Sequence, residues 1–138
     1  MTSPISIREI DHVVLRARDI TVMRRFYCEV LGCSVEKEQA GIGLLQLRAG
    51  RSLIDLVDVE GPLGRMGGVA AGSAGRNMDH FCVRVDPWDA DAIIQHLKAA
   101  GVDVGEAVSR YGAEGSGPSI YIADPEGNTV ELKGPPEN

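Results

Sequence analysis

The stretch IDHVVLRARDITVMRRFYCEVLGCSV at residues 10–35 has a counterpart in MDHFCVRVDPWDADAIIQHLKAAGVDV at residues 78–104. Both begin with an apolar residue and Asp-His, continue as a short apolar strand, and pass an acidic residue into an amphipathic helix. Both then reach a glycine before another strand. Self-similarity of this kind indicates two copies of one structural unit. We therefore predict two equivalent modules in the chain.

Each module contains a helix that hydrophobic spacing predicts. Asp19 is the expected N-cap of the first helix, and Asp86 is that of the second, where Pro87 suits the first helical position. Gly32 and Gly101 are the expected ends. The apolar stripes consist of Met23, Phe26, Tyr27, Val30 and Leu31 in the first helix, and of Ala90, Ile93, Ile94 and Leu97 in the second.

After each helix the chain returns as strands joined by tight turns. Residues 43–58, GLLQLRAGRSLIDLVD, predict a hairpin around AGR, and residues 119–134, SIYIADPEGNTVELKG, predict one around DPEGN. Each half therefore reads βαβββ, and we expect an α+β fold. We predict a single domain over residues 1–138, with a first module at about 8–60, a linker at 61–77 and a second module at about 78–134.

Two glycine-rich segments lie outside these predicted elements. Residues 61–77 contain six glycines without periodicity, which predicts a flexible linker between the modules. Asp55 and Glu131, which end the two hairpins, are farther apart in the chain than the two Asp-His pairs. The second module therefore carries extra residues, and we place them in a longer loop at 110–118, RYGAEGSGP.

Composition limits the classes of protein to which the chain can belong. Its 138 residues, 43% hydrophobic and 25% charged, predict one soluble domain with a substantial core. A net charge of −6, without basic runs interleaved with aromatics, argues against nucleic acid as a partner. Three cysteines without CxxC spacing predict neither a disulfide framework nor a cysteine metal site. No segment resembles a signal peptide or a membrane span, so we expect a cytoplasmic protein.

Potential metal ligands recur on one face of the predicted strands. In the strand after His80, Phe81 and Val83 face the helix, so His80 points to the opposite face. Two imidazoles and two carboxylates without thiolate suit one divalent ion such as Zn, Ni, Co, Mn or Fe(II). The alternation gives four such candidates, on two pairs of strands: His12, Asp55, His80 and Glu131.

A plainer interpretation accounts for each of these residues singly. A histidine on a strand is often a hydrogen-bonded structural residue, and Glu131 between Val130 and Leu132 has the pattern of a solvated face. The repetition of Asp-His at both strand starts, with an acid at both hairpin ends, favours the metal site. His96 lies off the apolar stripe of its helix, which predicts an exposed side chain.

The stretches IDHVVLRARDI, RRFYCEVLG, MDHFCVRV and YIADPEGNTVELK together resemble the vicinal oxygen chelate superfamily, also called the glyoxalase/bleomycin-resistance/dioxygenase group. The resemblance covers nearly the whole chain. It implies two βαβββ modules whose sheets form a barrel-like cleft, often completed between two chains of a dimer, with a divalent metal in the cleft. We therefore expect a homodimer that acts on a small molecule.

The resemblance also implies roles for individual residues. His12, His80 and Glu131 match the family's metal ligands. Asp55 stands where glyoxalase I-like members usually have Glu, and its shorter side chain leaves direct binding, binding through water and a three-ligand site all open. Arg16 stands where such sequences often carry an Arg near the substrate's carboxylate, and a salt bridge at the strand end is the alternative.

The activity implied is that of a glyoxalase I-like lyase or isomerase, of the lactoylglutathione lyase type. In that reaction a carboxylate beside the metal moves a proton between adjacent carbons of a hemithioacetal, which is a thiol conjugate. Glu131 is our first choice as the base and Asp55 our second. The candidate substrate-binding residues are Arg16, Tyr111, Ser119 and Tyr121, and the segment 110–118 is a candidate lid.

Relatives with similar residues leave other functions open. Bleomycin-binding members sequester a drug without a catalytic metal, methylmalonyl-CoA epimerase-like members transfer a proton beside a carbonyl, and fosfomycin-type members are thiol transferases. The His and Glu set favours a metalloenzyme over a metal-free binding protein. The residues do not decide whether the modules pair within one chain or across a dimer.

Overall fold

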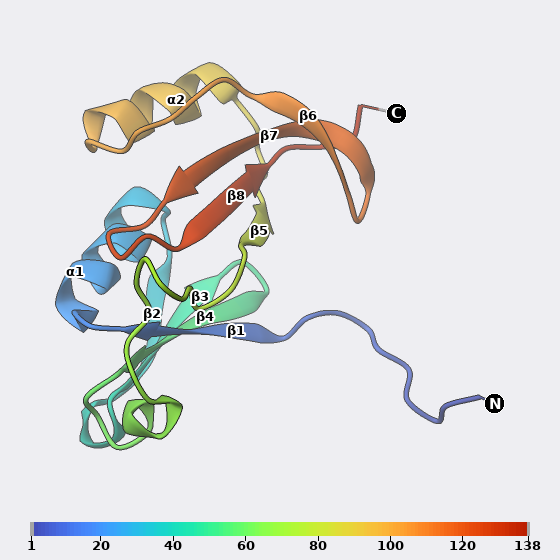
Figure 1. Cartoon of the computed structure of the whole chain (residues 1–138). Coiled ribbons are helices and arrows are strands. Elements are labelled where there is room, and N and C mark those ends of the chain that lie inside the picture. Colours follow the sequence, from blue (N-terminus) through green and yellow to red (C-terminus); the bar gives the residue numbers. More distant parts are fainter. Residues whose placement is uncertain (1, 138) are drawn as a thin grey trace.

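The computed structural model describes residues 2–137 and contains two sheets of four strands each (Figure 1). The first module consists of β1 (His12–Ala17), α1 (Ile20–Arg25), β2 (Ser34–Gln39), β3 (Leu44–Ala49) and β4 (Ser52–Asp58), and a π-helical turn, η1 (Phe26–Val30), extends α1. The second consists of β5 (Phe81–Arg84), α2 (Ala90–Ala99), β6 (Val108–Gly112), β7 (Gly115–Ala123) and β8 (Thr129–Lys133). The predicted α+β class with two βαβββ modules is confirmed.

The two sheets have the same topology. Their strand orders are β1-β4-β3-β2 and β5-β8-β7-β6, and in each the first strand runs parallel to the last. A parallel pair needs a crossover, which the helix of each module supplies. The registers place Val14 opposite Asp55 and Cys82 opposite Glu131, so the predicted acids occupy central strands.

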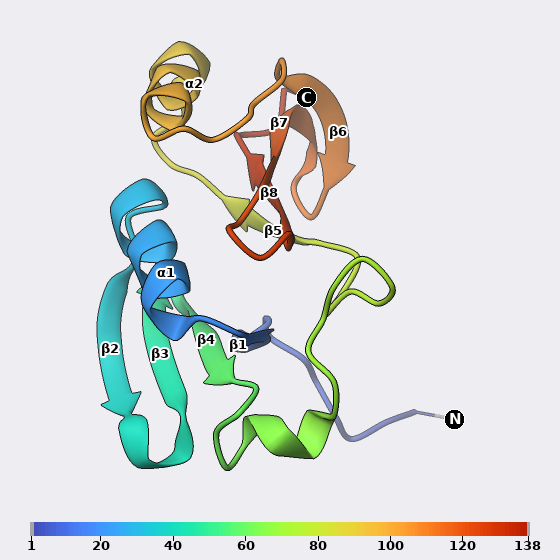
Figure 2. The same cartoon turned by 60° about the vertical axis from the view of Figure 1, so that its left-hand side comes forward.

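Each helix packs on its own sheet, and the two helices also meet (Figures 1 and 2). The ring Nε2–H of His96 donates to the carbonyl of Val30 across 2.8 Å, so this exposed side chain joins α2 to the end of η1. The apolar faces of both modules form one cluster, whose most deeply buried members include Leu15, Met23, Tyr27, Leu56, Leu97, Ile120 and Val130. No helix in residues 2–137 has the length and apolarity that a membrane crossing requires.

Capping explains where the helices begin. The carboxylate of Asp19 accepts from the backbone N–H of Val22, as predicted for the first helix. The prediction of Asp86 as the second cap is wrong, because Asp89 fills that position and accepts from the N–H of Ala92 across 3.1 Å. Asp86 therefore lies in the segment before α2.

The prediction of a loop over 110–118 is also wrong. These residues form most of a hairpin, in which β6 pairs with β7 from Val108 opposite Ser119 to Gly112 opposite Gly115. Backbone hydrogen bonds of a sheet do not depend on side chains, so a glycine-rich strand can pair without showing hydrophobic alternation. An ion pair of 2.8 Å between Arg84 and Glu114 holds the tip of the hairpin.

The linker between the modules contains regular structure, although its glycine content predicts a flexible segment. Residues Gly64–Gly67 form a 3-10 turn, η3, that packs against the first module. A Cβ on Gly64 would lie 1.8 Å from the carbonyl oxygen of Asp58, and one on Gly67 would lie 2.5 Å from Nε of Arg16. Close approach to the backbone therefore requires glycine at position 64, and a side chain at position 67 would displace the Arg16 guanidinium.

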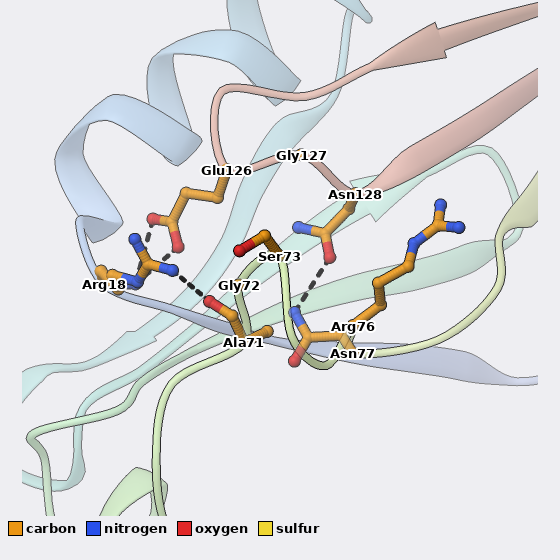
Figure 3. A pocket seen from close by; sticks show the side chains of 9 residues that line it. All are labelled: Arg18, Ala71, Gly72, Ser73, Arg76, Asn77, Glu126, Gly127 and Asn128. Carbon is orange, nitrogen blue, oxygen red and sulfur yellow. Dashed lines mark hydrogen bonds between the residues drawn. The ribbon is translucent and has the colours of Figure 1, made fainter.

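The DPEGN turn, residues 124–128, fastens the second module to the first. The Tyr27 hydroxyl donates to Asp124 Oδ2 across 2.8 Å, and the Glu126 carboxylate accepts from the backbone N–H groups of Arg18 and Asp19. Burial and the neighbouring Asp124 charge raise the pKa of Tyr27, so its hydroxyl stays protonated. These contacts bridge the modules beside a pocket of about 370 Å³ that holds none of the predicted metal ligands (Figure 3).

We predict that Tyr27→Phe destabilises the protein by about 1–2 kcal/mol, because it leaves a buried carboxylate with one hydrogen bond fewer. Thermal or urea unfolding measures the change. Tyr111→Phe is the matched control, since the Tyr111 side chain is 83% exposed. Equal effects of the two substitutions would show that the Tyr27 contact does not stabilise the module junction.

Candidate functional site

The predicted ligands lie on the sheet faces that the helices do not cover. Ile54 and Leu56 of β4 point to the helix side, which leaves Asp55 on the other face, and the same alternation applies to Glu131 on β8. Both carboxylates are nevertheless buried, with Asp55 4% and Glu131 6% exposed. Burial of an acid on a sheet face distinguishes these positions from an ordinary solvated face.

The second module brings His80 and Glu131 together. His80 Nε2 lies 3.3 Å from Glu131 Oε1, and His80 Nδ1 lies 2.5 Å from Asp79 Oδ2. A carboxylate at Nδ1 orients the ring and leaves Nε2 directed at its partner, which is the arrangement that metal-bound histidines usually have. This half of the site therefore has one imidazole and one buried carboxylate in contact.

The first module repeats this arrangement in part. His12 Nδ1 lies 2.8 Å from Asp11 Oδ1, and this hydrogen bond raises the pKa of His12, with a further contribution from the charge of Asp55. Asp55 Oδ2 accepts from Gln46 Nε2 across 3.2 Å. Asp55 Oδ1 is buried without a hydrogen-bond partner. An unpartnered buried carboxylate oxygen is costly alone and fits a site that a cation would complete.

The two halves stay apart within one chain. They belong to different sheets, and contacts of α2 and of the DPEGN turn with the first module join these two sheets (Figure 2). Among residues 2–137, no three His, Cys, Asp or Glu side chains are grouped so that they could hold a metal ion. The chain thus presents two separate imidazole–carboxylate pairs.

Two predicted substrate-binding residues lie beside the second pair. Tyr121 is the direct cross-strand neighbour of Glu131, and its ring meets the His80 ring edge-on at 5.4 Å. Ser119 lies on the same face and is fully buried. Burial and the charge of Glu131 raise the pKa of Tyr121, so its hydroxyl remains a donor at neutral pH.

The other two predicted substrate-binding residues are placed differently. Tyr111 projects from the opposite face of β6 and is 83% exposed. The Arg16 guanidinium donates to the carbonyls of Gly64, Gly68 and Val69 in the linker, at 3.0, 2.6 and 3.1 Å. Carbonyl groups of the linker therefore accept the hydrogen bonds of Arg16. The alternative prediction for Arg16 had expected a salt bridge with an acidic side chain at the strand end.

Three residues that the sequence did not single out contribute to this region. Gln46 bonds Asp55, and the guanidinium of Arg110 lies over the ring of Tyr121 with Cζ 4.2 Å from its centroid. Lys133 is buried and donates to the carbonyls of Arg110 and Gly117. A strand assignment for residues 108–112 would have found Arg110, because alternation then puts it on the face of Ser119 and Tyr121.

A thiol also lies on this face. Cys82 is the cross-strand partner of Glu131, and burial together with the charge of Glu131 raises the pKa of Cys82 to about 11. The thiol is therefore protonated at neutral pH.

Comparison with known proteins agrees with this architecture. The chain is 32% identical over 137 residues to virulence protein STM3117 of Salmonella typhimurium, covering 91% of this chain and 83% of that protein. The crystal structure of STM3117 matches with a TM-score of 0.76 and 29% identity over 95% of this chain and 99% of that one. An integron cassette protein from the mobile metagenome of V. cholerae matches with a TM-score of 0.76 and 29% identity, covering 94% and 97%.

A lactoylglutathione lyase structure from Agrobacterium tumefaciens has the same fold, with a TM-score of 0.66 and 24% identity over 96% of each chain. The family model of the Glyoxalase/Bleomycin resistance protein/Dioxygenase superfamily matches residues 9–132. That match spans both modules and all four predicted ligands, from His12 to Glu131. The chain therefore belongs to the glyoxalase/bleomycin resistance protein/dioxygenase superfamily.

Proposed function

We propose that the protein is a metal-dependent lyase or isomerase of the glyoxalase I type that acts as a homodimer on a small thiol conjugate. The observation that carries the proposal is the pair of matched sites, each with an Asp-oriented imidazole beside a buried carboxylate. The unpartnered Asp55 Oδ1 supports it further, since a cation would satisfy that atom.

The ligands would come from both modules. His12 and His80 present ring nitrogens, and Glu131 and Asp55 present oxygens, a donor set that suits Zn, Ni, Co, Mn or Fe(II). Bound there, a divalent ion supplies Lewis acidity toward two adjacent substrate oxygens. Asp79 and Asp11 hold the imidazoles in the orientation that binding requires.

The protein's own residues would carry the proton transfer. Glu131, or Asp55 in the second place, takes a proton from the carbon next to the substrate carbonyl and returns it to the neighbouring carbon. The burial of both acids keeps water away from the transferred proton. The Tyr121 hydroxyl, protonated and next to Glu131, donates a hydrogen bond to a substrate oxygen.

A dimer would bring the separated halves together. The pair of His12 and Asp55 in one chain would face the pair of His80 and Glu131 in the other, so a twofold axis generates two equivalent sites. This arrangement is supported by the observation that, among residues 2–137 of one chain, no three His, Cys, Asp or Glu side chains lie close enough together to hold a metal ion.

We predict that Asp79→Asn weakens Zn²⁺ binding by roughly 10–100-fold, because Asp79 orients the ring of His80. Isothermal titration calorimetry measures the affinity. Asp91→Asn, in the exposed first turn of α2, removes the same charge away from the site and should leave the affinity unchanged. A wild-type protein that binds no divalent ion would instead support the metal-free drug-binding function.

We predict that Glu131→Gln lowers isomerase turnover by roughly 100-fold or more, because the amide cannot accept the substrate proton. The measurement is a metal-reconstituted assay with methylglyoxal and glutathione, run beside other thiol hemithioacetals. A larger loss in Asp55→Asn would move the role of base to Asp55. Wild-type inactivity with every metal and thiol would favour an epimerase or thiol-transferase activity.

We predict that mixing inactive His12→Ala and His80→Ala proteins, after exchange of subunits, restores roughly a quarter of wild-type activity. Each mixed dimer contains one site that takes both histidines from intact modules. Glu131→Gln mixed with His80→Ala is the control and should stay inactive, because both substitutions lie in the second module. No recovery in either mixture would place each complete site within one chain.

A further inference from the structure

A pocket lies away from the candidate metal site, where the linker passes between the two modules. This junction pocket has a volume of about 370 Å³ and is lined by Arg18 between β1 and α1, by linker residues 71–77 and by the DPEGN turn (Figure 3). None of the four predicted metal ligands lines it. Its volume falls within the range of roughly 300–1,000 Å³ that small-molecule sites usually have. The pocket is therefore large enough to hold a ligand of its own.

The charged groups around the linker are mostly positive. A wider cavity of about 690 Å³ shares Arg18, Arg76 and most of the linker residues with the junction pocket. The charged side chains that line this wider cavity are all arginines, and the junction pocket adds one acid, Glu126. The whole chain has a net charge of −6, so this region has the opposite sign to the protein as a whole. A local concentration of positive charge attracts anions.

The single acid of the junction pocket is already compensated. The Glu126 carboxylate accepts from the backbone N–H of Arg18 at 2.8 and 3.0 Å and from that of Asp19 at 2.8 Å. Hydrogen bonds from N–H groups stabilise the negative charge of a carboxylate. The charge of Glu126 is therefore held at the start of α1.

The two arginines of the junction pocket, by contrast, have no counter-ion. Arg18 Nη2 donates to the carbonyl of Ala71, and Arg76 Nη2 donates to the carbonyl of Asp79 at 3.0 Å and to the hydroxyl of Thr129 at 2.6 Å. Within the described part of the chain, neither guanidinium forms an ion pair with a carboxylate. Nε and Nη1 of both side chains form no hydrogen bond there either. These nitrogens are available to an external acceptor.

The linker adds a hydroxyl to this pocket. Gly72 and Gly75 form a tight turn in which the N–H of each donates to the carbonyl of the other, at 2.8 and 3.2 Å. Ser73 lies at the tip of this turn, and Figure 3 shows it between Arg18 on one side of the pocket and Arg76 on the other. A Cβ on Gly72 would lie 3.1 Å from Arg18 Nη2, so glycine at this position leaves room for the guanidinium.

We propose that the junction pocket is a second ligand site that binds a phosphate group, with Arg18 as its main anchor, Arg76 as a second cation and Ser73 as a hydroxyl donor. A phosphate carries up to two negative charges and several strong acceptor oxygens, so it can satisfy donors that come from separate segments. The ligand is inorganic phosphate or a small phosphate ester. Because the walls belong to both modules, the bound ligand bridges them and stabilises the folded chain. The site does not depend on the proposed function.

The test is calorimetric titration of the metal-free protein with inorganic phosphate and with glycerol phosphate. We expect Arg18→Gln to weaken the better-bound probe by roughly tenfold or more, as loss of a charge-assisted hydrogen bond does. Arg65→Gln removes the same charge from η3, outside the pocket, and should change the affinity by less than about twofold. The preferred probe tells whether the ligand is free phosphate or an ester. No binding to the wild type, or equal losses in the two variants, would overturn the proposal.

Three further measurements locate the site and guard against a folding defect. Arg110→Gln removes the cation that stacks on Tyr121 and should leave the phosphate affinity unchanged, whereas a loss there instead of in Arg18→Gln would place the phosphate at the candidate metal site and refute the proposal. Phosphate should raise the thermal unfolding midpoint of the wild type more than that of Arg18→Gln. Ser73→Ala should weaken phosphate roughly threefold. If Arg18→Gln does not fold, wild-type affinity in Ser73→Ala overturns the proposal.

Discussion

The parallel pairing of the first and last strands in each module is the constraint on which the rest of the structure depends. β1 beside β4, and β5 beside β8, require a crossover, so each module needs a helix, and that helix must cover one face of its sheet. The uncovered face is then the place for polar groups. Because the histidine stands at the start of the first strand and the acid on the last, the pairing makes them neighbours in both modules.

Charged side chains are buried on the sheet faces that the helices leave uncovered. This burial distinguishes the two sheets from ordinary sheets, in which the face away from the helices is polar and exposed to solvent. Asp55, Glu131 and Lys133 are all nearly inaccessible. Burying an ionised group is unfavourable unless hydrogen bonds or counter-charges compensate it. Lys133 is compensated by two carbonyls, whereas Asp55 keeps one oxygen without a partner. The stability of the fold does not require such an atom, and a bound cation would explain it.

The module junction depends on backbone groups as much as on side chains. The Glu126 carboxylate binds two N–H groups at the start of α1, and the Arg16 guanidinium binds three carbonyls of the linker. Both contacts join segments that are far apart in the chain. Glycine at position 64 is a consequence of close approach to the backbone of Asp58, and glycine at position 67 leaves room for the Arg16 guanidinium, so packing accounts for part of the glycine content of the linker.

The amino-acid sequence by itself was sufficient to predict the two βαβββ modules. It also predicted the side of each sheet on which the four candidate ligands lie: His12, Asp55, His80 and Glu131. These features follow from strand and helix periodicity, which is local. Three-dimensional packing was needed to learn that the two imidazole–carboxylate pairs stay apart in one chain, that linker carbonyls bind Arg16, and that Arg110 rather than Tyr111 shares a face with Tyr121. Those features depend on contacts between distant segments and on a strand whose pairing relies on backbone hydrogen bonds, and neither leaves a periodic pattern in the sequence.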